Sequence, residues 1–166
     1  MKKVMLLLAL LLLLTVGNAL AAPINTLEKQ QMTVGIVGGN VTNAYYLEDK
    51  VTNNLSIGIQ YIDGDVDCYG QIDFSDNVNS ETIPKLIIGN RDYSSGSTTY
   101  IGAAVRAPIN EDFAGYAIAL FGKSLQELQL GFTSELNDSV FMNVNYRIVE
   151  HHGTSKGIGL GIGCRL

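Results

Sequence analysis

Two stretches near the end of the chain decide the fold: SVFMNVNYRIV at residues 139–149 and KGIGLGIGCRL at residues 156–166. In the first, every second side chain from Val140 to Ile148 is apolar, and Asn143, Asn145 and Arg147 lie between them. In the second, the apolar side chains alternate with glycine and arginine. Successive side chains of a β-strand point to opposite faces, so a period of two predicts a strand. Each stretch therefore predicts a strand with one wholly apolar face.

The same alternation recurs upstream, between short clusters of Asn, Asp, Gly, Pro and Ser that favour turns. The further runs are residues 32–39, 43–48, 54–62, 66–74, 84–91, 98–107, 112–121 and 126–135. Strand starts follow one another too closely for helical crossovers, which excludes parallel α/β folds. The pattern predicts an all-β, antiparallel up-and-down barrel with ten strands. Eight strands are the alternative, if residues 32–48 form one irregular segment.

The first residues predict a secretory signal peptide. Lys2 and Lys3 precede an unbroken apolar run at residues 4–14, which is too short to span a bilayer as a helix. Small residues follow at Ala19-Leu20-Ala21, where a peptidase would cut. We therefore expect a signal peptide at residues 1–21 and one barrel domain at residues 22–166.

Charge excludes one class of partner. The whole chain has only 16% charged residues, and residues 22–166 retain 9 basic and 16 acidic side chains, a net charge of −7. Nucleic-acid binding requires clustered Lys and Arg that neutralise phosphates, so we expect no nucleic-acid partner.

The composition of the two faces indicates which of them points outward. If the apolar face filled a soluble barrel, the exterior would carry the glycines of residues 157–163 and few charges, and it would be poorly solvated. An apolar face against lipid leaves the other row in a narrow lumen, where glycine makes room and opposite charges pair. The predicted lipid-facing residues are Leu128, Leu130, Phe132, Val140, Met142, Val144, Tyr146, Ile148, Ile158, Leu160 and Ile162. The predicted charge network of the lumen is Asp67, Asp73, Lys85, Arg91, Arg106, Glu127, Glu135, Arg147 and Arg165.

The signal peptide, the strands of about ten residues and the terminal strand that alternates up to Leu166 resemble small bacterial outer-membrane β-barrels of the outer-membrane protein A and X type. The resemblance implies the outer membrane as location, and outer-membrane lipid and the barrel-assembly machinery as partners. It also implies that the turns at residues 63–65, 92–97, 122–125 and 150–155 lie outside the cell. The chain departs from this family in ending on Leu166 instead of an aromatic residue, and in having no Trp for the membrane interfaces.

Two patterns suggest chemistry, and each has a simpler explanation. Glu150, His151, His152 and Ser155 could supply a lipid-deacylating site or a metal site, but a solvated loop explains them better. Asp63-Gly64-Asp65 begins like a calcium loop but lacks the carboxylate at its twelfth position, so a tight hairpin is expected instead. We predict no catalytic residue, no metal site and no cofactor. The two cysteines, Cys68 and Cys164, fall on strands that are not neighbours and are expected to be unpaired.

The sequence therefore favours a non-enzymatic outer-membrane barrel with a structural or interaction role and a lumen largely filled by side chains. The alternatives are a narrow porin-like pore, a soluble periplasmic lipocalin-like carrier and a lipid-modifying barrel enzyme.

Overall fold

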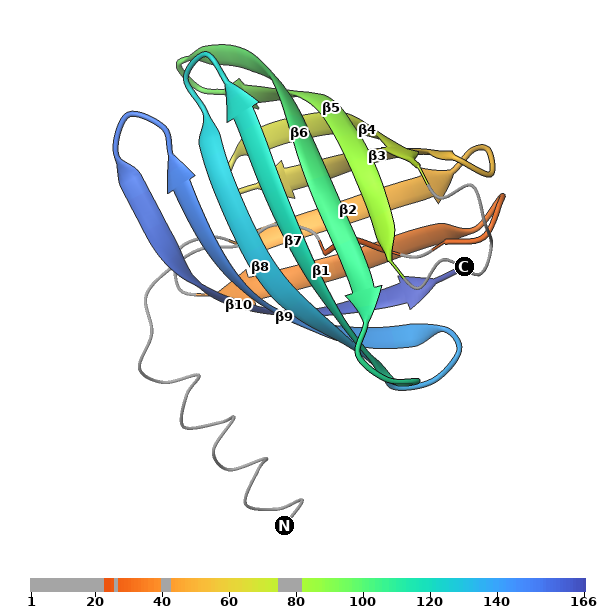
Figure 1. Ribbon diagram of the computed structural model, residues 1–166. Helices are drawn as coiled ribbons and strands as arrows, with labels where there is room; N and C mark the ends of the chain where they lie inside the picture. The colour runs from red at the N-terminus through yellow and green to blue at the C-terminus, as the bar shows by residue number, and fades with distance from the viewer. Residues whose placement is uncertain (1–22, 26, 40–42, 75–81) are drawn as a thin grey trace, which may run out of the picture.

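A computed structural model describes residues 23–25, 27–39, 43–74 and 82–166 of the chain (Figure 1). The predicted signal peptide lies outside these residues. Ten strands follow one another along the chain. They are β1 (Met32–Gly39), β2 (Asn43–Lys50), β3 (Leu55–Ile62), β4 (Asp65–Asp73), β5 (Ile83–Tyr93), β6 (Gly96–Pro108), β7 (Phe113–Gly122), β8 (Gln126–Glu135), β9 (Val140–Glu150) and β10 (Thr154–Arg165).

The sheet closes on itself. Each strand pairs antiparallel with its neighbours in sequence, and β1 pairs with β10, with Val34 opposite Cys164. The ten-strand prediction is confirmed, and residues 32–48 form two strands, not one irregular segment. The predicted ranges differ from the observed ones by no more than two residues, chiefly because β2 continues to Lys50 and β5 to Tyr93. Closure leaves no sheet edge with unpaired backbone groups.

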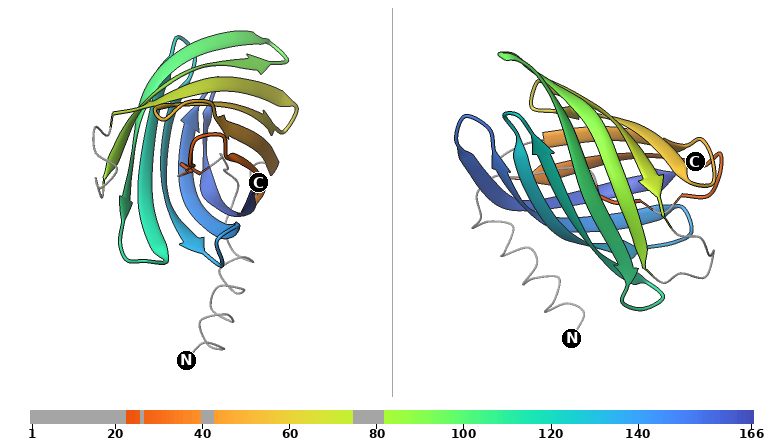
Figure 2. Two further views of the ribbon diagram at one scale, coloured as in Figure 1. Left: turned by 90° about the vertical axis from the view of Figure 1, so that its right-hand side faces the viewer. Right: turned by 45° about the horizontal axis from the view of Figure 1, so that its top comes forward.

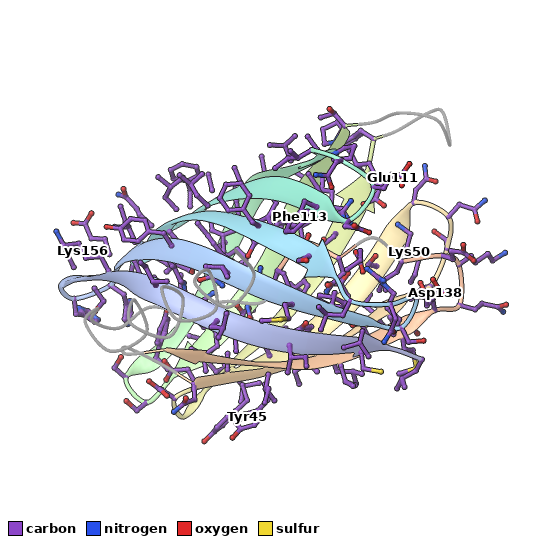
Figure 3. The ribbon with its side chains drawn as sticks, turned by 90° about the horizontal axis from the view of Figure 1, so that it is seen from below. Tyr45, Lys50, Glu111, Phe113, Asp138 and Lys156 are labelled. Carbon is purple, nitrogen blue, oxygen red and sulfur yellow. The ribbon has the colours of Figure 1, made fainter. Side chains whose placement is uncertain are left out.

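The two faces of the sheet differ in chemistry. In β8, Glu127, Gln129 and Thr133 point inward and are buried, whereas Leu128, Leu130 and Phe132 point outward and are exposed, Phe132 to 58%. The outer faces of the remaining nine strands also expose apolar side chains. Tyr45 of β2, for example, extends away from the barrel in Figure 3. The barrel is thus apolar outside and mostly polar inside, the reverse of a soluble barrel.

Aromatic rings cover glycines on the inner wall. The rings of Tyr46, Tyr69, Tyr100, Tyr116 and Phe141 each lie over a glycine of a neighbouring strand, in the order Gly35, Gly58, Gly89, Gly131 and Gly163. A Cβ atom at any of these glycines would overlap the ring. Glycine therefore provides the space in which large side chains lie flat against the wall, as the sequence predicts for the row that includes Gly163.

The two ends of the barrel are distinct. At the first, called here the terminal end, β1 begins and β10 finishes, and Leu166 donates its backbone N–H to the carbonyl oxygen of Met32 at 2.9 Å. Lys50, Glu111 and Asp138 lie there in Figure 3, with Lys156 at the other end, called here the far end. The far-end turns that the structure describes are short, at residues 63–64, 94–95, 123–125 and 151–153. Asp63 and Gly64 both have positive φ, 48° and 105°, which matches the predicted tight hairpin.

Candidate functional site: the barrel lumen

Four buried charges cross the lumen toward the far end. Arg91 of β5 donates to Oδ2 of Asp67 on β4 through Nη2 at 2.7 Å, and to Oε2 of Glu127 on β8 through Nη1 at 2.9 Å. Arg147 of β9 donates to the same Oε2 atom of Glu127 at 2.6 Å and to its Oε1 atom at 2.7 Å. Strands β5 and β8 are not neighbours, so the contact between Arg91 and Glu127 spans the interior. These four residues are called here the charge bridge.

The charge bridge is almost fully sequestered from solvent. The exposed fraction of Arg91 is 2% and that of Asp67 is 0%. Two uncharged side chains also donate hydrogen bonds to the carboxylate of Asp67. The Tyr100 hydroxyl donates to Oδ1 at 2.7 Å, and the Gln60 amide donates to Oδ2 at 2.9 Å. Buried charges are tolerated when they are paired and hydrogen-bonded in this way.

A second cluster lies toward the terminal end on β2, β4 and β5. Asp73 forms ion pairs with Lys50 and, at 3.1 Å, with Lys85. Glu48, which is fully buried, accepts hydrogen bonds from the Tyr69 hydroxyl at 3.1 Å and the Gln71 amide at 3.2 Å. The sequence prediction included Asp73 and Lys85 but missed Glu48 and Lys50. Continuing the period of two through β2 places both residues on the inner face, so the signal was present in the sequence.

A third cluster lies at the rim of the terminal end. Arg165 of β10 forms a bidentate pair with Glu135 of β8, at 2.7 and 2.8 Å, and Arg106 of β6 approaches the same carboxylate at 3.8 Å. Unlike the charge bridge, this cluster is partly open to solvent, with side-chain exposures of 13% for Arg165 and 26% for Glu135. The structure thus places all nine predicted lumen charges inward and brings them together in three separate groups.

An amide network fills the wall opposite β2 and β3. The Tyr116 hydroxyl accepts hydrogen bonds from Gln129 and from Asn143, each at 2.8 Å, and Asn145 donates to the Asn143 oxygen at 2.8 Å. The two asparagines lie on the inward row of β9 that alternation assigns to the lumen. Sequence reasoning did not predict that Asn143 would bind Tyr116 of β7, or that Gln129 of β8 would share that hydroxyl.

The predicted lipid-facing residues lie on the outside of the barrel. Val140, Met142, Ile148 and Leu160 are half-buried between their neighbours, and the exposed residues are Leu128, Leu130, Phe132, Val144, Tyr146, Ile158 and Ile162. Cys68 is exposed, Cys164 is partly exposed, and both are free thiols, as expected.

The lumen also contains a part of the chain that belongs to no strand. Pro23, Ile24, Asn25 and Leu27 are buried, although they precede β1. Figure 2 (left) shows this red trace encircled by the strands. Residues 23–25 and 27–31 are called here the lumen segment. The sequence carries no periodic signal for this position, and we did not predict it.

The lumen segment and the wall side chains leave little free space between them. A cavity of about 30 Å³ remains, lined by Pro23, Ile24 and residues of the wall that include Tyr69, Gln129 and Glu127. Such a volume holds about two water molecules. At this level of the lumen, Pro23 and Ile24 and the surrounding wall side chains pack closely around that cavity.

In the loop with the two histidines, one ring is held by an aromatic neighbour and a backbone oxygen. His151 stacks on Tyr93 with ring centroids 3.7 Å apart, and its Nδ1 atom lies 2.7 Å from the backbone oxygen of Ser124. His152 has a φ of 52° and, with Gly153, forms the turn itself, and Ser155 is exposed. No group of three or more potential metal ligands occurs among the described residues.

Comparison with solved structures identifies proteins of similar fold. No protein-family model matches the chain, and no curated protein sequence matches it either. Among solved structures, the KdgM porin is similar with a TM-score of 0.51 and 9% identity, over 81% of this chain and 97% of that one. The KdgM porin in complex with disordered oligogalacturonate gives a TM-score of 0.53, with the same identity and coverage. The NanC porin gives 0.50 and 9% identity, over 82% of this chain and 99% of that one.

The neighbours are porins, not enzymes, and at such low identity the likeness shows the fold alone. These structures do not test the predicted resemblance to outer-membrane proteins A and X in particular. Together with the apolar outer face, the comparison gives one conclusion: the chain folds as a ten-stranded, closed, antiparallel transmembrane β-barrel whose structural neighbours are small outer-membrane porins.

Proposed function

We propose that this chain is a non-enzymatic outer-membrane barrel with a structural or interaction role, and that its lumen is closed at rest. In this proposal, residues 1–21 direct export and are removed, and the barrel-assembly machinery inserts residues 22–166 into outer-membrane lipid. The single observation that carries the proposal is the filled lumen, in which the charge bridge and the lumen segment occupy the interior.

The geometry argues against two of the alternatives. A lipocalin-like carrier needs an apolar interior for its ligand, whereas this interior holds Asp67, Glu127 and Arg91 and the apolar rows point outward. A lipid-modifying enzyme needs an assembled nucleophile and base, whereas His151 is held against Tyr93 and the Ser124 backbone.

A porin-like pore is the second candidate function. The observation that favours it is the fold shared with the KdgM and NanC porins, together with a wall lined by charges, amides and phenols. In this candidate the lumen opens by rearranging the groups that now fill it.

Conductance separates the two candidates. The chain from Ala22 onward is refolded into detergent micelles, checked for a heat-modifiable band on gels, and added to planar lipid bilayers. We expect membrane-associated, heat-modifiable protein without steady channel currents. Stable unitary currents from the wild-type chain would reject the closed barrel in favour of the pore. A soluble protein without a mobility shift would reject both candidates.

A further inference from the structure

Ile24 of the lumen segment lies in an apolar pocket of the lumen wall. Its exposed fraction is 1%, and it belongs to a buried cluster with side chains of β4 to β7. The wall residues of this cluster include Tyr69, Ile87, Tyr100, Ile118 and Leu120. The hydroxyl of Tyr100 binds Asp67 of the charge bridge, and the apolar atoms of the patch pack against Ile24. The patch therefore matches an apolar side chain brought in from outside the sheet.

The residue after Ile24 is recognised by polar groups. Lys85 donates from Nζ to the backbone oxygen of Asn25 at 3.2 Å, and the Asn25 amide donates to Oε2 of Glu48 at 3.5 Å. Asn25 is buried, and its Oδ1 atom has no hydrogen-bond partner among the described residues. Oε1 of Glu48 and Oε1 of Gln71 are also without such a partner. The polar contacts thus orient the segment, but they leave these three buried oxygen atoms without a hydrogen bond from the described residues.

The last residues of the lumen segment are held at the terminal end by the backbone of β2. Gln30 donates its backbone N–H to the Lys50 oxygen at 2.8 Å, and Gln31 donates to the Glu28 oxygen at 3.0 Å. Glu28, Lys29 and Gln30 are exposed, and β1 begins only at Met32. Among the described residues, 23–25 and 27 take part in no hydrogen bond of the strand ladder, so their withdrawal toward the terminal end would leave the sheet paired. If the leader is cut after Ala21, the mature chain begins one residue before Pro23, so a free end could withdraw without threading.

From these contacts we propose that the lumen contains a binding site for an extended peptide, and that the chain's own residues 23–25 and 27 are its exchangeable occupant. The site takes a branched apolar side chain in the pocket of Tyr69, Tyr100 and Ile118, followed by a residue whose carbonyl oxygen Lys85 binds and whose side-chain amide Glu48 accepts. Withdrawal of the segment exposes a surface lined by phenols and amides. This inference goes beyond the closed barrel, because it adds a ligand and a means of opening.

The test is peptide binding in trans. Two chains are refolded in the same detergent, one beginning at Ala22 and one beginning at Glu28, and the heat-modifiable band verifies that each has folded. The probe is a synthetic peptide of residues 22–27 with a fluorophore at its carboxyl end, followed by fluorescence anisotropy. We expect saturable binding to the shortened chain, at least about tenfold tighter than to the chain that carries its own segment.

A matched peptide gives the specificity control. Placing Asp at the position of Ile24 brings a carboxylate into an apolar pocket, which is unfavourable unless the charge is paired. We expect this peptide to bind the shortened chain at least about tenfold more weakly than the natural one. Equal binding of both peptides, equal binding to both chains, or no binding to a folded shortened chain would each overturn the proposal.

A point variant covers the case in which the shortened chain does not fold. Ile24→Asp in the chain from Ala22 should displace the segment, so that the natural peptide binds this variant but not the wild type. Glu28→Ala changes an exposed side chain of the same segment and serves as the control, which should behave as wild type. A folded I24D chain that fails to bind the peptide contradicts the inference. Wild-type channel currents would contradict only the closed-barrel function, so the two failures are distinguishable.

Discussion

The charge bridge and the rim cluster use the same chemistry in different surroundings. Both join arginines from two strands through one glutamate, Glu127 in the bridge and Glu135 at the rim. Glu127 is buried and bound at both oxygens by guanidinium groups, whereas Glu135 is partly exposed and one of its arginines lies 3.8 Å away. The comparison teaches that burial, and not the number of charges, decides how much the barrel depends on a lumen ion pair.

The largest expected effect comes from neutralising the buried glutamate. Glu127→Gln keeps the shape of the side chain but leaves Arg91 and Arg147 without their shared counter-charge in a buried site. We expect a loss of about 3–5 kcal/mol in the free energy of unfolding. The measurement is the urea midpoint for loss of the fast-migrating folded band, and Glu150→Gln, at an exposed strand end, is the control. Equal midpoints for the two variants would break the comparison.

A neutral site between the two ends tests whether packing matters as much as charge. A Cβ at Gly131 would overlap the Tyr116 ring, whereas the nearest atom to a Cβ at Gly38 is Oδ1 of Asn43 at 3.9 Å. Gly131→Ala should therefore destabilise the barrel by about 1–3 kcal/mol. Gly38→Ala should be neutral or slightly stabilising, since alanine loses less backbone freedom than glycine. If both substitutions give the same unfolding midpoint, the aromatic rings do not need these glycines.

The rim cluster should respond weakly to the same neutralisation. Glu135→Gln removes the partner of Arg106 and Arg165, but solvent can hydrate both guanidinium groups. We expect a loss of about 1 kcal/mol or less, reduced further at high salt because a partly exposed pair is screened. Unfolding midpoints in low and high salt check this directly. A loss of unfolding free energy as large as that of E127Q would show that the barrel depends on the rim cluster as much as on the charge bridge.

The smallest effect is expected on the outer face. Cys68 and Cys164 are free thiols on the outward rows, and neither takes part in a charge cluster. Cys68→Ala and Cys164→Val should each change the free energy of unfolding by no more than about 0.5 kcal/mol. Loss of the heat-modifiable band in either variant would show that the outer face contributes to stability as the buried lumen charges do.

Much of the fold was predictable because strand alternation is local. Residues 126–135 were assigned to a strand with its observed bounds, and the inward position of Glu127 followed from its alternation with Leu128 and Leu130. The ends of strands were less predictable, because Lys50 and Tyr93 continue the pairing of β2 and β5 into segments that read as turns. Pairing across the sheet, and not local composition, determines where a strand ends.

The candidate site was predictable in its members and not in its connections. Alternation assigns Arg91 and Glu127 to the lumen, but their contact joins residues 36 positions apart on strands that are not neighbours. Nothing in the sequence indicated where Ile24 would lie, because the residues around it show no hydrophobic periodicity from which a buried face could be assigned.

The sequence by itself determined the strands, their two faces and the apolar exterior, because each follows from a period of two that needs no distant partner. Only the tertiary structure decided which charges meet and what fills the lumen. Closing ten strands sets the width of the interior, and that width brings Arg91 to Glu127 and encloses Ile24.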